Sequence, residues 1–242
     1  MSHSHSHSHP PPPIVPGFGA DRAVHYDAQI SVALAGAQAL HEVSACALAS
    51  QLEGQDTASL LSVGLGTGLE LVPFTRLEVP GWRFTGVDPS AAMLEVARQR
   101  LDTEGLLART HLHVGELHTL PPGPLFDGGA MLGVVHHVEG EEARLALLRE
   151  VNRRLKPGAP FVVGCRIGPD PVLSEVELRR WATYGVSREE LEKRRQGLAT
   201  MRPPESDAAL CALLARAGLV SPRQLFASLQ FKVWLTRSEP MP

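Results

Sequence analysis

The sequence predicts an α/β protein in which helices cover both faces of a mostly parallel β-sheet. Short apolar runs alternate with amphipathic stretches between residues 59 and 165. This alternation is typical of right-handed βαβ units. The run Leu60–Val63 is apolar except for one Ser, which suits a central strand that is buried on both faces. With 242 residues the chain is long enough for one domain with a full hydrophobic core.

The first residues do not resemble a folded segment. Met1–His9 alternates Ser with His, and Pro10–Pro13 follows as a short polyproline stretch. This composition is typical of an affinity tag or a disordered tail, and it lacks the apolar centre of a signal peptide. We therefore expect residues 1–16 to be a disordered His- and Pro-rich tail, and residues 17–242 to form a single domain.

An Ala-rich segment, Phe18–Leu52, then repeats apolar residues at three- and four-residue spacing, which predicts helix. The strand-like runs that follow are Ser59–Val63, Arg83–Val87, Thr110–Val114, Ala130–Val135 and Pro160–Cys165. Amphipathic stretches lie between them at Ala91–Asp102 and Glu141–Leu155, and the second is ended by Lys156-Pro157-Gly158. We expect an N-terminal helical part at 17–55 and a sheet core at 56–170.

After Arg166 the alternation stops. Residues 171–205 are rich in Arg and Glu with a helical period, and we expect a helical insertion there. Residues 206–242 predict one more helix, Ser206–Ala217, and two β-runs, Gln224–Ser228 and Gln230–Thr236. The connection between these runs is so short that antiparallel pairing is expected.

Composition excludes several classes of protein. Lys and Arg number 23 against 26 Asp and Glu, a net charge of −3, which disfavours a nucleic-acid binder. No apolar run reaches the roughly 18–20 residues of a membrane span. Cys46, Cys165 and Cys211 are odd in number and far apart, which favours a reducing, cytoplasmic location. Outside the tail, His111 and His113 alternate on a strand-like run and His118 follows in a loop, and no metal site is expected.

The most informative segment is a glycine loop after the first predicted strand. Gly64, Gly66 and Gly68 permit positive φ angles and close approach of a ligand to the backbone. The dinucleotide fingerprint GxGxxG requires its third glycine where this chain has Leu69. Asp88 ends the second strand, where a carboxylate can accept hydrogen bonds from both ribose hydroxyls. The loop therefore suits a nucleoside ligand without a phosphate and disfavours a dehydrogenase.

These motifs resemble the class I S-adenosylmethionine-dependent methyltransferases, and the resemblance runs from about Phe18 to the end of the chain. Five segments match in order: Val63–Gly68, Gly86–Leu94, Gly115–Leu117, Phe126–His137 and Arg154–Gly158. The resemblance implies a Rossmann-like three-layer sandwich whose seven-stranded sheet has its last strand antiparallel, with S-adenosyl-L-methionine as cofactor. The implied cofactor-binding residues are Tyr26, Gly64, Leu65, Gly66, Thr67, Gly68, Asp88, Pro89, Met93, Gly115, Glu116, Leu117, Leu132 and Val135.

A narrower resemblance concerns the two ends of the chain. Ala23–Asp27 looks like the lid of small-molecule and tRNA-modifying members. Residues 189–218 resemble the tRNA wobble-uridine carboxymethyltransferases, in which an arginine reads the extra carboxylate of carboxy-S-adenosylmethionine; Arg195 is its match here. We expect S-adenosyl-L-methionine itself as the cofactor of this chain, rather than its carboxylated form.

Methyl transfer from a sulfonium needs a base only when the acceptor carries a proton. His136 follows the fourth strand at the ligand-binding edge and is the candidate base, with packing as the alternative role. The candidate substrate-binding residues are Arg166, Trp181, Tyr184 and Arg195. A solvated strand end explains Arg166 equally well, and core packing is the commoner role of aromatic residues such as Trp181 and Tyr184.

The sequence thus predicts a methyltransferase acting on a small-molecule acceptor. Two alternatives stay open: tRNA wobble-uridine modification with the carboxylated cofactor, and a cofactor-binding protein without turnover. The sequence indicates neither the acceptor atom nor the oligomeric state.

Overall fold

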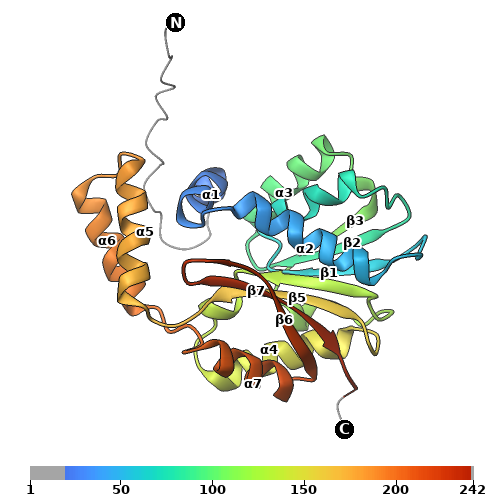
Figure 1. Ribbon diagram of the computed structural model, residues 1–242. Helices are drawn as coiled ribbons and strands as arrows, with labels where there is room; N and C mark the ends of the chain where they lie inside the picture. The colour runs from blue at the N-terminus through green and yellow to red at the C-terminus, as the bar shows by residue number, and fades with distance from the viewer. Residues whose placement is uncertain (1–19, 241–242) are drawn as a thin grey trace, which may run out of the picture.

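In the computed structural model the sheet has seven strands in the order β3-β2-β1-β4-β5-β7-β6 (Figure 1). The structure describes residues 20–240, so the predicted tail at 1–16 and Phe18 lie outside the described residues. The strands are β1 Ser59–Val63, β2 Arg83–Asp88, β3 Thr110–Val114, β4 Gly128–Leu132, β5 Pro160–Arg166, β6 Leu219–Ser228 and β7 Phe231–Ser238. Only β7 among them runs antiparallel to its neighbours, which confirms the predicted fold class.

The fourth and sixth strands differ most from prediction. The fourth strand was expected at Ala130–Val135, but β4 occupies Gly128–Leu132, and Val135 begins a short 3₁₀ helix, η4 (Val135–His137). A side chain on Gly129 would lie 2.3 Å from the Leu61 carbonyl oxygen, so this strand position requires glycine despite its weak strand propensity. β6 begins at Leu219, five residues before the predicted start.

One face of the sheet is covered by α2 (Ala37–Gln51), the 3₁₀ helix η1 (Leu69–Arg76) and α3 (Ala91–Thr103). Their apolar side chains pack on Leu60, Phe84, Val162 and Val233 of the sheet. Because β1 alternates its side chains between the faces, Leu61 and Val63 lie in the other layer. Two further 3₁₀ turns, η2 (Leu107–Arg109) and η3 (Leu117–Thr119), flank β3.

The opposite face is covered by α4 (Glu141–Arg154) and α7 (Asp207–Arg216). Leu145, Leu148 and Val151 of α4 pack with leucines of α7 against Met131, Phe161 and Val163. The caps follow local rules: the Ser206 hydroxyl accepts a hydrogen bond from the Ala209 N–H at the start of α7. The three layers of helix, sheet and helix are therefore complete.

The N-terminal helical part divides into two helices with different roles. α1 (Ala20–Ala33) and α2 are separated at Gly36, which has φ 80°, and the two segments meet at 91°. α2 packs on the sheet through Leu40, Ala45 and Leu48, so only α1 corresponds to the predicted lid. No single described helix is long and apolar enough to cross a membrane. One bent pair of described segments, His25–Ala33 with Ala37–Gln51, has the combined length and composition of a membrane span.

The helical insertion lies beside α1, away from the sheet core (Figure 1). It consists of α5 (Pro171–Thr183) and α6 (Arg188–Thr200). The N-caps are Asp170, which accepts from the Leu173 N–H, and Ser187, which accepts from the Glu190 N–H. α1, α5 and α6 together form a cap above the carboxyl ends of β1, β4 and β5.

Candidate active site

The glycine loop forms a bare stretch of backbone directly after β1. Gly64, Gly66 and Gly68 have φ angles of 71°, 56° and 79°, in the left-handed region that L-residues avoid. A Cβ on Gly64 would lie 2.3 Å from Val134 Cγ2, so the loop also needs glycine for space. Gly86 of β2 has the same property, since its Cβ would meet Leu65 Cδ2 at 2.3 Å.

Asp88 connects this loop to the end of β2. Its Oδ2 accepts a hydrogen bond from the Gly66 N–H at 2.9 Å, and its Oδ1 accepts one from the Ser90 N–H at 2.8 Å. Burial raises the pKa of this carboxyl group, and the two backbone hydrogen bonds act in the opposite direction. Each carboxylate oxygen has a further lone pair, so Asp88 retains the capacity to accept ribose hydroxyls.

A second network joins the glycine loop to the lid. The Thr67 hydroxyl donates to Asp27 Oδ1 of α1 at 2.6 Å. Arg100 of α3 donates to the Thr67 carbonyl oxygen at 2.5 Å and also pairs with Asp27 Oδ2. We call Asp27, Thr67 and Arg100 the lid latch, because it holds α1 against the loop.

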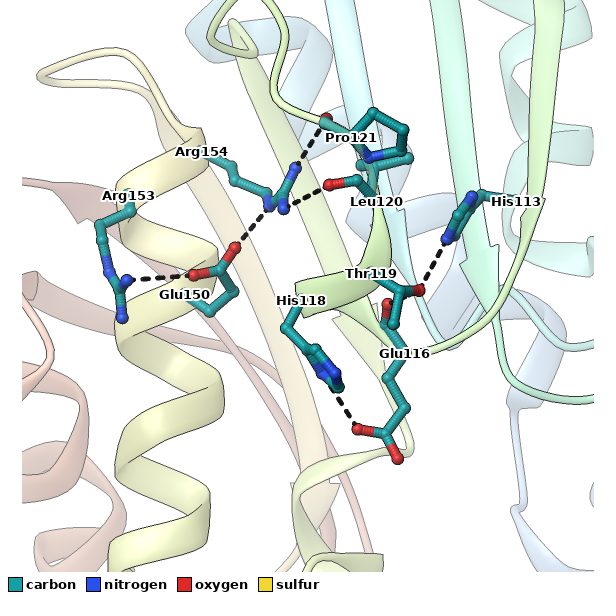
Figure 2. Close-up of polar contacts among 9 residues, drawn as sticks. All are labelled: His113, Glu116, His118, Thr119, Leu120, Pro121, Glu150, Arg153 and Arg154. Atoms are coloured by element: carbon teal, nitrogen blue, oxygen red, sulfur yellow. Dashed lines mark hydrogen bonds and ion pairs between the residues drawn. The ribbon is translucent and has the colours of Figure 1, made fainter.

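The segment after β3, predicted to bind the cofactor, is held by side chains on both sides (Figure 2). Thr119 Oγ1 donates to the Glu116 carbonyl oxygen at 2.8 Å and lies 2.8 Å from His113 Nε2. The carboxylate of Glu116 is exposed and pairs with His118 Nδ1 at 3.2 Å. From α4, Arg154 donates to the Leu120 carbonyl oxygen at 2.7 Å. The turn Gly115–Leu117 is thus fixed by neighbours of different elements.

A cavity of about 640 Å³ opens between the glycine loop and the cap. Its floor includes Gly64–Thr67, Glu70, Leu132 and Gly133, and its walls come from α1, α5, α6 and the β6–β7 turn. Of the predicted residues, it is lined by Tyr26, Gly64, Leu65, Gly66, Thr67, Leu132, His136, Arg166 and Trp181. This volume lies within the range of small-molecule sites.

The charged groups of the cavity wall are compensated. Arg166 pairs with the buried Glu177 carboxylate and donates to the Gln230 side-chain oxygen. Arg194 lies with its guanidinium carbon 3.5 Å above the ring centre of Trp181 and pairs with Glu190 at 3.3 Å. Lys193 pairs with Glu189 at 2.9 Å. The wall therefore presents ion pairs and aromatic surface to a ligand.

His136 is held in one orientation by the backbone. Its Nδ1 accepts a hydrogen bond from the Arg166 N–H at 3.3 Å, and its ring meets Phe231 edge-on at 6.0 Å. Burial lowers its pKa well below 6.5, with the neighbouring charges of His137 and Arg166 adding to the effect. In the neutral ring with Nδ1 accepting, Nε2 carries the proton. To act as a base through Nε2, His136 would need the tautomer that is protonated at Nδ1. In the tautomer described here, Nε2 donates a hydrogen bond instead.

The other predicted site residues lie outside the cavity lining. Arg195 is on the exposed side of α6, paired with Glu175 at 2.7 Å and with Glu192. Tyr184 caps the end of α5 and lies under Arg180. Met93, Leu117 and Val135 are buried in the protein interior, Pro89 is exposed, and Gly68 packs against Ala97 of α3. The cofactor roles of these residues stay predictions.

The structure adds residues that sequence reasoning did not select, above all Asp27, Glu70, Glu177 and Arg194. Glu70 lies two residues after the glycine loop in η1, half-buried in the cavity lining, and the Ser62 hydroxyl donates a hydrogen bond to it. Burial raises its pKa to about 8, the Ser62 hydrogen bond lowers it, and the charge of Asp88 raises it. Its one sequence signal is a lone acid in an apolar stretch, Leu69–Phe74. Residues 20–240 contain no group of three His, Cys, Asp or Glu side chains placed to hold a metal ion.

Comparison with known proteins identifies the domain at the centre of the chain. Residues 61–161 match the family model of the methyltransferase domain. An uncharacterized protein from a Streptomyces fradiae transposon is 35% identical over 117 residues, which are 47% of this chain and 31% of that protein. The release factor glutamine methyltransferase of Chlorobaculum tepidum is 33% identical over 114 residues, 47% of this chain and 38% of that enzyme. The chain thus matches about a third of the length of these relatives.

Solved structures agree over a larger share of the chain. A putative S-adenosyl-L-methionine-dependent methyltransferase from Methanococcus maripaludis superimposes with a TM-score of 0.64 at 16% identity, covering 95% of this chain and 97% of that one. A putative O-methyltransferase from Nostoc punctiforme gives 0.62 at 18% identity, covering 90% and 59%. Residues 61–161 thus form a methyltransferase domain, and the chain has the fold of the class I S-adenosylmethionine-dependent methyltransferases, which indicates S-adenosyl-L-methionine as its cofactor.

Proposed function

We propose that this protein transfers the methyl group of S-adenosyl-L-methionine to a small-molecule acceptor. The observation that carries the proposal is the cavity of about 640 Å³ bounded by the glycine loop on one side and by α1, α5 and α6 on the other. An acceptor in this cavity lies against the loop that holds the methyl donor. The cap also covers part of this space, and partial exclusion of water favours in-line methyl transfer.

The cofactor supplies a sulfonium methyl group that needs no activation by the protein. The residues of the chain would instead orient the two reactants. Asp88 and the Gly64–Gly68 backbone fit the ribose and the chain that follows it. Trp181 and Phe231 offer aromatic surface to the acceptor, and His136 offers a hydrogen-bond donor. This assignment favours alignment over proton abstraction by His136.

Methyl transfer can be tested directly with purified protein. We would incubate it with S-adenosyl-L-methionine and small sets of phenols, amines, thiols and carboxylic acids, and detect S-adenosylhomocysteine and methylated product by mass spectrometry. Asp88→Asn should lose turnover at low cofactor concentration, whereas Arg195→Ala, on the outer side of α6, should retain it. Cofactor binding without turnover on any set would favour the alternative of a binding protein.

Modification of tRNA with a carboxylated cofactor has less support. A carboxylate reader needs a cation that faces the cofactor, and Arg195 instead pairs with Glu175 on the exposed side of α6. Arg166 and Arg194 line the cavity but each pairs with a glutamate. Equal affinity for the plain and carboxylated cofactor would contradict our preference for the plain one.

We also keep a cytoplasmic location as a proposal. Cys46, Cys165 and Cys211 are all free thiols, which is typical of proteins in a reducing compartment.

A further inference from the structure

Glu70 is a half-buried acid whose environment suits a positively charged ligand. It lies in η1, between the glycine loop and the helix α2, and it lines the cavity. Its recorded partner is the neutral Ser62 hydroxyl. Among the residues whose side chains the structure describes, no cation pairs with Glu70. The other two acids of the cavity lining, Glu177 and Glu190, each pair with an arginine. An ionised carboxylate without a cation is costly in such a place.

The charged groups around Glu70 do not supply that cation. Asp88, at the end of β2, is itself acidic and opposes ionisation of Glu70. His41 of α2 lines the same cavity, but burial lowers its pKa to about 4, so it is neutral above pH 5. On the outer side of α2, Glu42 is occupied by Arg76 of η1. Arg100 of α3 is held by Asp27 in the lid latch.

The position of Glu70 matches one end of the cofactor. Asp88 marks the ribose end of the glycine loop, and Glu70 lies on the cavity side of the same loop. A methionine chain that leaves the ribose and enters the cavity passes Gly66 and Thr67 and carries an α-ammonium group. We propose that the Glu70 carboxylate binds the α-ammonium group of the cofactor, and that Glu70 releases its proton to solvent when the cofactor binds.

The size of the effect follows from the pKa of about 8 for the free protein. At pH 7 about 0.9 of the Glu70 side chains hold a proton, so binding releases up to about 0.9 proton per cofactor. Between pH 6 and pH 7 the ionised fraction rises by a factor of about nine, and cofactor affinity should rise by the same factor. Higher pH is avoided because an α-amino group itself loses its proton at about pH 8.

The experiment is isothermal titration calorimetry of S-adenosyl-L-methionine binding, at pH 6 and 7, in phosphate and in Tris. The difference in binding enthalpy between the buffers gives the number of protons released. Glu70→Gln, which keeps the shape and a hydrogen bond to Ser62, should abolish most of the release and the ninefold pH effect. Glu53→Gln, the same change at an exposed position with no recorded side-chain partner, should leave both unchanged.

Two further measurements keep the proposal falsifiable if Glu70→Gln does not fold. Ser62→Ala removes the hydrogen bond that stabilises the ionised form, so the pH dependence should move to higher pH. Among ligands, S-adenosylhomocysteine keeps the ammonium group and should release the proton, whereas 5′-methylthioadenosine lacks it and should not. Release with S-adenosyl-L-methionine alone would overturn the assignment in favour of the sulfonium, and no release with any ligand would overturn the proposal entirely. Neither result depends on an acceptor, so the test stands apart from the proposed methyl transfer.

Discussion

The lid latch offers the sharpest test of how the cap is held on the sheet. In Asp27→Asn the side chain keeps its size and one acceptor oxygen but loses the charge that pairs with Arg100. The paired Arg100 and Asp27 side chains are 22% and 30% exposed, so the contact is partly screened by water. Hydrogen bonds to charged groups contribute about 1.5–3 kcal/mol when well buried. From the lower part of that range we expect a loss of about 2 kcal/mol, or roughly 30-fold in the lid-opening equilibrium.

Hydrogen exchange measured by mass spectrometry can separate this local effect from global destabilisation. Amides of α1 should exchange up to about 30-fold faster in Asp27→Asn, while those of β1 and β5 keep their wild-type rates. Asp102→Asn, an exposed aspartate on the same helix as Arg100, is the matched control. Thr67→Val removes the hydroxyl that donates to Asp27. Its effect on the exchange of α1 amides should be smaller in the Asp27→Asn variant than in the wild type. The reasoning would be refuted by unchanged exchange in α1, or by faster exchange of equal size throughout the sheet.

Three further changes test the loop and its two acids. Asp88→Asn should weaken cofactor binding by about 1–3 kcal/mol because a charged acceptor is lost, and unchanged affinity in calorimetry would remove Asp88 from the site. Gly64→Ala places a methyl group 2.3 Å from Val134 Cγ2 at a φ of 71°, so the melting temperature should fall, and adding Val134→Ala should restore part of it. The folded-state pKa of Glu70 exceeds the value of 4.5 taken for an unperturbed Glu, so the cofactor-free protein should lose stability as pH rises from about 4.5 to 8. Denaturant unfolding of Glu70→Gln should lack that decline, and an equal decline in the variant would contradict the assigned pKa.

Local sequence patterns were sufficient for most of the sheet. The five parallel strands of the core follow from apolar runs between amphipathic helices, and the turn at Gly36 is the one break that the Ala-rich N-terminal segment concealed. β6 begins at Leu219 rather than at the predicted Gln224, and it therefore includes Pro222. It is an edge strand with a bulge, where a missing N–H donor is tolerated, and this placement depends on the assembled sheet.

The glycine loop and Asp88 were predictable because their chemistry is local: three positive φ angles in five residues, and an acid at a strand end. The lid latch was not, since Asp27 and Arg100 are 73 residues apart and meet only when α1 docks on α3. The same holds for Arg166 and Glu177, whose pairing depends on how α5 folds back over β5. Sequence spacing says nothing about contacts that are created by the packing of separate elements.

The three consecutive cations of α6 show that a single structural variable, the rotation of one helix, can decide which residue lines the site. Successive residues of a helix point about 100° apart, so only one of Lys193, Arg194 and Arg195 can point fully into the cap. Glutamates four residues earlier are available to both Lys193 and Arg194, and the pattern alone therefore does not choose between them. The rotation of α6 is fixed instead by Trp181 of α5, whose ring takes the Arg194 guanidinium at 3.5 Å. This rotation places Arg195 on the exposed side of α6. The cation that lines the cavity is Arg194, which is already stacked on Trp181 and paired with Glu190, so this wall suits uncharged acceptors.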